Sequence, residues 1–141
     1  MTARPPRVTG LLETSLYVDD LDRSATFYQR LFGFECFVRD ERMCGLGVPG
    51  QSVLLLFRRG GSVQSSPTPG GTIPSHDGQG RLHLCFAIPW GELAAWQQHL
   101  EQQHLAVESR VTWPRGGVSL YFRDPDGNSV EVATPGLWPN H

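Results

Sequence analysis

The sequence predicts an α+β fold made of two βαβββ modules, and three observations support this prediction. The order strand, helix, three strands occurs twice along the chain. A segment rich in Gly, Ser and Pro separates the two occurrences. Corresponding positions recur at a nearly constant interval, as for Glu13 and His83, which lie 70 positions apart. Because neither module buries a sheet face alone, we expect an open, curved eight-stranded mixed sheet with the helices on its outer face.

The first module is expected over about residues 10–58. It begins with an alternating strand over residues 11–18. The two sides of that strand carry Leu12, Leu16 and Val18 against Glu13, Ser15 and Tyr17. Carboxylates then begin a helix, which Gly33 ends. Three further strands are expected over residues 34–38, 43–48 and 51–57.

Residues 59–80 form the Gly/Ser/Pro-rich segment, which reads as a linker or a long functional loop. The second module then covers about residues 81–135 and repeats the order of the first. Its expected elements are a strand over 82–88, a helix over about 91–103, and short strands near 107–111, 118–122 and 129–133. We therefore expect a single domain over residues 1–141.

Composition excludes several classes of protein. The chain has 12 Lys and Arg against 14 Asp and Glu, so it lacks the basic excess of a nucleic-acid-binding protein. All of its cationic residues other than histidine are arginines, which rules out Schiff-base chemistry on lysine. The three cysteines show no C-x-x-C spacing and are expected to be reduced and mostly buried. No apolar run approaches the length of about 20 residues that a membrane helix needs, and no secretory h-region follows the start, so we expect a cytoplasmic location.

The alternation of the strands selects three residues for the concave face. If Leu84 and Phe86 pack under the second helix, His83 and Cys85 face the cavity. The same rule buries the valines of the last strand and turns Glu131 inward. Glu13, His83 and Glu131 therefore converge if the two halves pair symmetrically.

Two segments resemble the vicinal-oxygen-chelate superfamily. They are residues 17–34 and the run Asp-Pro-Asp-Gly-Asn-Ser-Val-Glu, which ends at Glu131. This superfamily contains glyoxalase I, bleomycin-resistance proteins, thiol-transferring fosfomycin-resistance enzymes and type I extradiol dioxygenases. The resemblance implies metal ligands at Glu13, His83 and Glu131, the positions that the alternation selects. It also implies a homodimer and a small-molecule substrate.

The sequence departs from the family at two positions. Glu13 stands where the family usually has His, and Leu55 stands where glyoxalase I carries a further Glu. A set of one histidine and two carboxylates suits Fe, Mn, Ni, Co or Zn and leaves positions open for substrate or water.

The resemblance implies a metal-dependent enzyme whose substrate chelates the metal through adjacent oxygens, of lyase, isomerase or ring-cleavage dioxygenase type. The alternative is a metal-free protein that sequesters a ligand, as bleomycin-resistance members do. Catalytic support is expected from Tyr121, by proton transfer, and from Arg115, by holding a carboxylate. Substrate contacts are expected from His76, Trp113 and Tyr17.

Each of these functional assignments has a simpler structural alternative. Glu13 is also compatible with a surface carboxylate, and His83 with a buried neutral histidine. Glu131 has an ion pair with Arg81 or Arg123 as its alternative. His76 has a solvated loop side chain as its alternative. For the Asp-Pro-Asp-Gly run itself a tight structural turn is the better account.

Overall fold

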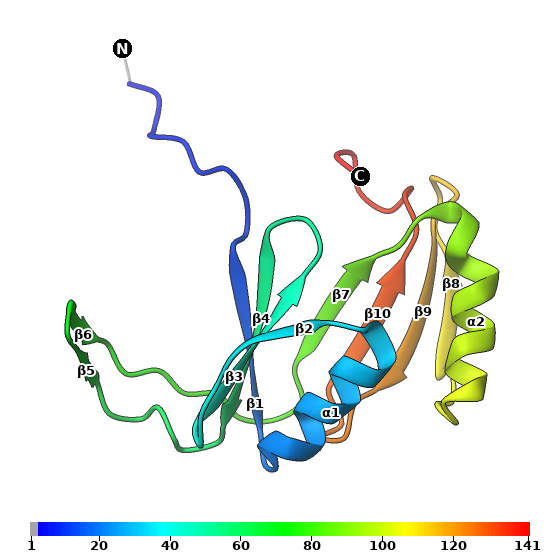
Figure 1. Ribbon diagram of the computed structural model, residues 1–141. Helices are drawn as coiled ribbons and strands as arrows, with labels where there is room; N and C mark the ends of the chain where they lie inside the picture. Colours follow the sequence, from blue (N-terminus) through cyan, green and yellow to red (C-terminus); the bar gives the residue numbers. More distant parts are fainter. Residues whose placement is uncertain (1–2) are drawn as a thin grey trace.

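Each half of the chain forms a four-stranded mixed sheet with one main helix (Figure 1). The computed structural model describes residues 3–141. The first half contains β1 (Glu13–Val18), α1 (Leu21–Phe32), β2 (Glu35–Arg39), β3 (Met43–Val48) and β4 (Ser52–Arg58). The second contains β7 (His83–Ala87), the short 3-10 helix η1 (Trp90–Glu92), α2 (Leu93–Gln102), β8 (Ser109–Thr112), β9 (Val118–Arg123) and β10 (Ser129–Ala133). The α+β class and the two βαβββ units are confirmed.

The two sheets have the same topology. Their strand orders are β1-β4-β3-β2 and β7-β10-β9-β8. In each sheet the first and last strands in sequence pair in parallel, β1 with β4 and β7 with β10. Glu13 and His83 both open the first strand of their sheet, as the repeat predicted. The eight strands form two sheets of four rather than one continuous hydrogen-bonded sheet.

Local signals define α1 at both ends. Asp20 caps its start, because the carboxylate accepts a hydrogen bond from the Arg23 amide at 3.0 Å. Gly33 ends it with a φ of 71°, and its amide bonds to the Gln29 carbonyl at 2.8 Å. One face of the helix is buried in the core through Leu21, Ser24, Ala25, Tyr28 and Leu31.

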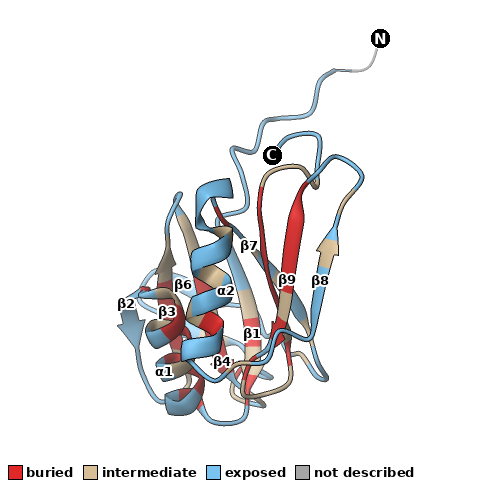
Figure 2. Cartoon of the chain, turned by 90° about the vertical axis from the view of Figure 1, so that its right-hand side faces the viewer, coloured by how far each residue is buried: buried red, intermediate tan, exposed pale blue. Residues whose placement is uncertain are grey.

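The second helix lies at the surface. Only Leu100 of α2 is buried, and Figure 2 shows most of the helix as exposed while β9 is largely buried. Its link to the first half runs through α1. His99 Nε2 bonds to the Leu31 carbonyl at 2.8 Å, and the Trp96 and Phe32 rings lie 5.2 Å apart. No helix in residues 3–141 is long and apolar enough to cross a membrane.

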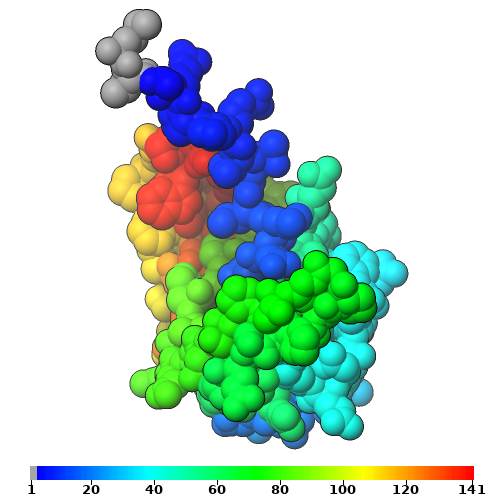
Figure 3. Space-filling model, turned by 90° about the vertical axis from the view of Figure 1, so that its left-hand side faces the viewer, coloured from blue at the N-terminus to red at the C-terminus, as the bar shows by residue number. Residues whose placement is uncertain are grey.

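The segment between the halves contains structure that the sequence did not reveal. Its middle forms a hairpin of β5 (Ser66–Thr68) and β6 (Gly71–Ile73). Its later part folds back, since the His76 amide bonds to the Ser62 carbonyl at 2.9 Å. In Figure 3 the segment, in green, lies across the lower part of one face of the molecule. We call residues 59–80 the strap.

The Asp-Pro-Asp-Gly-Asn turn ties the two halves together. Asp124 accepts a hydrogen bond from the Tyr28 hydroxyl at 2.7 Å, and Asp126 accepts from the Asp19 amide at 2.9 Å. Asn128 accepts from the Leu82 amide at 2.8 Å. The turn therefore has the structural role expected for it, and it joins the start of α1 to the second sheet.

One expectation about β1 is wrong. Leu12 was expected on the buried side of the strand with Leu16, but it is 66% exposed and lies just before β1 begins. Leu11 is 91% exposed. Two apolar side chains that no residue in 3–141 covers therefore directly precede the strand.

Candidate functional site

His83 and Glu131 lie in contact on neighbouring strands of the second sheet. His83 Nε2 is 3.3 Å from Glu131 Oε1, and His83 Nδ1 is 2.9 Å from the Ser129 carbonyl oxygen. A carbonyl only accepts, so Nδ1 carries a proton and, in the neutral ring, Nε2 presents its lone pair to the carboxylate. Two electron-pair donors thus face each other, an arrangement that a cation or a proton between them stabilises.

The Glu131 carboxylate is buried and held by a hydroxyl rather than by an arginine. Its residue is 4% exposed, and its second oxygen accepts a short hydrogen bond from the Ser119 hydroxyl. Trp113 Nε1 in turn donates to Ser119 Oγ at 2.8 Å. Arg123 pairs instead with Glu108, at 2.7 Å. Trp113, Ser119 and Glu131 therefore form a relay that fixes the orientation of the carboxylate.

Tyr121 borders the same pair. It lies opposite Glu131 in the register of β9 and β10, and its ring stacks on His83 with the centroids 6.2 Å apart. Burial, and then the charge of Glu131, raise the pKa of the Tyr121 phenol. The phenol therefore stays protonated at neutral pH and is placed to donate a proton. This also shows which side of β9 faces the site, because Leu120 and Phe122 lie in the core.

Cys85 of β7 lies opposite Glu131 in the register of β7 and β10. Desolvation by the surrounding atoms and the adjacent carboxylate raise the pKa of the Cys85 thiol to about 12. The residue nonetheless keeps contact with solvent, so the expectation that the cysteines are mostly buried fails for Cys85. The reason is that no part of residues 3–141 covers the face of β7 that carries His83 and Cys85.

Glu13 does not join this pair within one chain. It is exposed at the start of β1, in the other sheet (Figure 1). Residues 3–141 contain no group of three or more His, Cys, Asp or Glu side chains that could hold a metal ion. Leu55, in register with Ser15, offers no ligand atom from β4. Two of the three predicted ligands, His83 and Glu131, therefore lie in contact, and the role of all three as metal ligands stays a prediction.

The residues expected to contact substrate fall into separate groups. The Tyr17 hydroxyl is 2.7 Å from His76 Nδ1, and the His76 ring lies edge-on to Phe57 with the centroids 4.5 Å apart. This contact docks the strap on the first sheet. Trp113 belongs to the relay of the second sheet, while Arg115 is exposed in the turn between β8 and β9.

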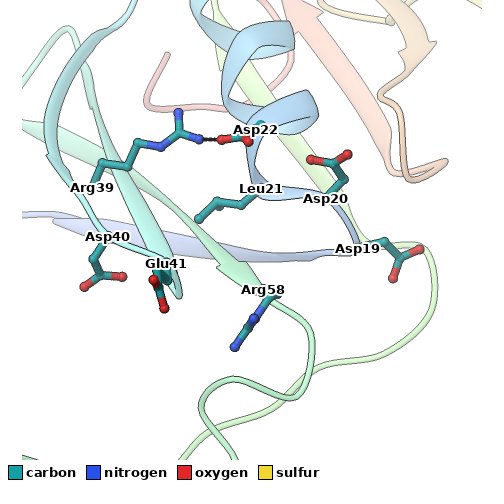
Figure 4. A pocket seen from close by; sticks show the side chains of 8 residues that line it. All are labelled: Asp19, Asp20, Leu21, Asp22, Arg39, Asp40, Glu41 and Arg58. Atoms are coloured by element: carbon teal, nitrogen blue, oxygen red, sulfur yellow. Dashed lines mark ion pairs between the residues drawn. The ribbon is translucent and has the colours of Figure 1, made fainter.

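An open acidic hollow of about 770 Å³ lies elsewhere, between the start of α1 and the turn that joins β2 to β3 (Figure 4). Its carboxylates are largely engaged in local structure. Asp22 pairs with Arg39, Asp20 caps α1, and Asp40 accepts from the amides of Arg42 and Met43 at 2.8 and 2.9 Å. We assign no ligand to it.

Ser119 is the member of the site that sequence reasoning missed. Ser119 lies two residues before Tyr121 on β9, so both side chains are on the same face of the strand. That face also carries Glu131 of β10, and the register partner of Ser119 on β10 is Ala133. The alternation of side chains along β9 was the signal available in the sequence. It did not show which face of β9 points into the site until the partner strand and its register were known.

Comparisons with known proteins agree with this fold. Residues 10–132 match the family model described as Glyoxalase/Bleomycin resistance protein/Dioxygenase superfamily. The chain is 25% identical over 129 residues to a metallothiol transferase FosB of Bacillus licheniformis, covering 91% of this chain and 77% of that protein. It is 26% identical to a catechol-2,3-dioxygenase of Bacillus subtilis, but spans only 38% of it.

A solved structure is similar over nearly the whole chain. The crystal structure of lactoylglutathione lyase from Agrobacterium tumefaciens shares 36% identity and a TM-score of 0.85. The similarity covers 96% of this chain and 99% of that one.

Proposed function

The chain belongs to the glyoxalase/bleomycin resistance protein/dioxygenase superfamily, and on that premise we propose that it is a divalent-metal-dependent enzyme for a small substrate with two adjacent oxygen atoms. The observation that carries the proposal is the His83–Glu131 pair. A nitrogen lone pair and a buried carboxylate converge at 3.3 Å without an arginine between them. These are ligand types that first-row divalent ions accept.

The donor set fits a metal at two of three positions, and a second copy of the chain is the source that we propose for the third. Glu13 directly follows Leu11 and Leu12, which are 91% and 66% exposed. A homodimer interface that covers these leucines would also carry Glu13 into the concave face of the partner. The set would then be Glu13 from one protomer with His83 and Glu131 from the other.

When bound, the metal supplies Lewis-acid polarisation of the substrate oxygens. Tyr121 donates a proton beside His83, since its phenol is held in the neutral form. Arg115, in the turn between β8 and β9, binds a substrate carboxylate near Trp113. Tyr17 and His76 lie on the first sheet and contact substrate from the protomer that supplies Glu13. Lyase or isomerase chemistry is the first candidate because the similar solved structure is named a lyase, with thiol transfer and dioxygenation next.

Metal analysis tests the proposal directly. We expect near-stoichiometric metal in protein purified without chelator, and its loss in His83→Ala and Glu131→Gln variants that keep the parent circular dichroism spectrum. Glu108→Gln is the matched control, because that carboxylate is exposed and pairs with Arg123. A parent that binds none of Fe(II), Mn(II), Ni(II), Co(II) or Zn(II) would overturn the enzyme proposal and favour the metal-free ligand-sequestering protein.

Mixing variants tests whether two copies share the site. Glu13→Gln and Glu131→Gln homodimers should each bind little metal. If the ligands come from different protomers, a mixed dimer contains one site with all three ligands, so mixing the two variants after mild dissociation restores metal binding in part. If one chain supplies all three, mixing restores none.

A further inference from the structure

Two thiols touch in the first sheet, away from the candidate site. Cys36 Sγ on β2 lies 3.6 Å from Cys44 Sγ on β3. Cys44 is fully buried, whereas Cys36 keeps partial contact with solvent. Neither cysteine has a role in the proposed function, and the third, Cys85, is on β7 in the other sheet.

The strand that carries Cys36 has room to adjust. β2 is an edge strand, paired only with β3. The register between them shifts between Cys36 and Val38, which leaves Phe37 without a partner in the ladder. Because a disulfide has an S–S bond of about 2.05 Å, the sulfurs must approach further. A bulged edge strand permits that approach at lower cost than a central strand would.

We propose that Cys36 and Cys44 are a redox modification site, which a peroxide converts to an intramolecular disulfide. Cys36, as the accessible thiol, attacks the peroxide O–O bond, becoming a sulfenic acid with release of water. Cys44 then attacks the Cys36 sulfur, and the hydroxyl leaves with the Cys44 proton as a second water. The two thiols together lose two electrons and two protons, and the peroxide is reduced to water.

The environments of the two sulfurs assign these roles. Burial, followed by the neighbouring Cys36, raises the pKa of Cys44 to about 12, so Cys44 remains a thiol at neutral pH. It is also out of reach of a dissolved oxidant. Cys44 therefore acts as the resolving thiol and not as the first target.

The bond would fix one wall of the acidic hollow. The segment that it closes contains the turn between β2 and β3, with Arg39, Asp40 and Glu41 on the wall shown in Figure 4. Reduction would leave that turn held by the Asp40 hydrogen bonds and the Arg39–Asp22 ion pair, without the covalent link. The inference is independent of the metal proposal, since it uses neither His83 nor Glu131.

Tryptic mapping gives a direct test, because Arg39 and Arg42 lie between the two cysteines. Cleavage places Cys36 in peptide 31–39 and Cys44 in peptide 43–58, so only a disulfide can join them. The full chain with Cys85→Ser is treated with hydrogen peroxide, alkylated and digested without reductant. The matched control carries Cys36→Ser in addition.

We expect a linked species whose mass is the sum of the two peptides less two hydrogen atoms. It should disappear with dithiothreitol, be absent from the control and form in a yield independent of protein concentration. Accumulation of Cys36 sulfinic acid without the linked pair would overturn the proposal. So would free thiols at both positions at a peroxide dose that oxidises Cys85 in the parent.

Discussion

A buried hydroxyl decides how the key carboxylate points. Ser119 donates to one oxygen of Glu131 and accepts from Trp113, which leaves the other carboxylate oxygen toward His83. A carboxylate with 4% exposure would otherwise be costly to keep charged. The alternation of the strand selected Glu131, but the hydroxyl that makes its burial tolerable became visible only in the structure.

Ser119→Ala should weaken metal binding while the protein stays folded. Removing a group that orients a ligand typically costs about 10- to 100-fold in metal affinity. Isothermal titration with the metal found in the parent measures this. Ser129→Ala is the control, because Ser129 meets His83 only through its carbonyl, and it should leave the affinity unchanged. Equal affinity in Ser119→Ala would refute the orienting role.

Tyr28→Phe should lower stability by about 2 kcal/mol, the usual range for a hydrogen bond to a charged group. The buried Tyr28 hydroxyl donates to Asp124 at 2.7 Å, and the substitution removes the donor without leaving a large cavity. Urea unfolding at neutral pH measures the difference. A change below experimental error would show that the hydroxyl contributes nothing to the link between the halves.

The same residue gives a pH dependence. Burial, then Asp124, raise the pKa of Tyr28 far above the ordinary value of about 10. In the unfolded chain the phenol ionises near pH 10, whereas in the folded chain it does not, so stability falls as pH rises above about 10. Tyr28→Phe should show a shallower fall, which urea unfolding between pH 8 and pH 11 would detect. Parallel curves would contradict this.

The strap is the element that the sequence described least well. It docks through His76 on Tyr17 and through the close approach of Gly78 to the Tyr17 ring. A Cβ at position 78 would lie 2.2 Å from a ring carbon. Position 78 therefore requires glycine because of its contact with Tyr17 of β1. No local pattern distinguishes this glycine from the others in the Gly-rich segment.

Gly78→Ala should loosen the strap without unfolding the sheets. We expect hydrogen exchange at the His76 amide to rise by about 10-fold or more, because its bond to the Ser62 carbonyl depends on the fold-back of the strap, which the contacts with Tyr17 hold in place. Gly70→Ala is the matched control, since a Cβ there meets nothing within 4 Å. An unchanged exchange rate in Gly78→Ala would mean that Tyr17 simply moves aside.

Across the whole molecule, one core and one turn join the two halves. The core cluster includes Leu16 and Leu54 of the first half together with Leu120 and Val132 of the second. The Asp126 side chain, with no exposure, accepts from the Asp19 amide and, at 3.0 Å, from the Ser24 hydroxyl. We therefore predict a single cooperative unfolding transition, with equal calorimetric and van't Hoff enthalpies. Two separate transitions would show that the halves fold independently.

Asp126→Ala should lower the free energy of unfolding by about 3 kcal/mol, because it removes the acceptor of the Asp19 amide and of the buried Ser24 hydroxyl. Asp22→Ala is the control. That carboxylate is exposed and forms only a surface pair with Arg39, so its loss should cost less than about 1 kcal/mol. Guanidinium unfolding of both variants measures the difference. Equal losses of stability would show that Asp126 contributes no more than a surface carboxylate to joining the halves.

Sequence by itself determined the strands and helices of both modules and the positions of His83 and Glu131. Those features depend on short-range chemistry: period-two alternation, the Asp20 cap, and glycines where φ must be positive, as at Gly33 and Gly127. They can therefore be recognised from a short stretch of sequence around each element. The strand order of each sheet and the parallel pairing of its first and last strands in sequence were not predicted and come from the structure.

Only the tertiary structure decided which side chains meet across strands. The Ser119 relay, the docked strap, the exposed thiol of Cys85 and the Cys36–Cys44 contact each join residues whose proximity depends on strand register or on a fold-back. Register is set by the packing of the whole sheet and not by any local run of residues. The separation of Glu13 from His83 and Glu131 has the same origin, because the two halves join through α1 and the Asp-Pro-Asp-Gly-Asn turn and form two separate sheets.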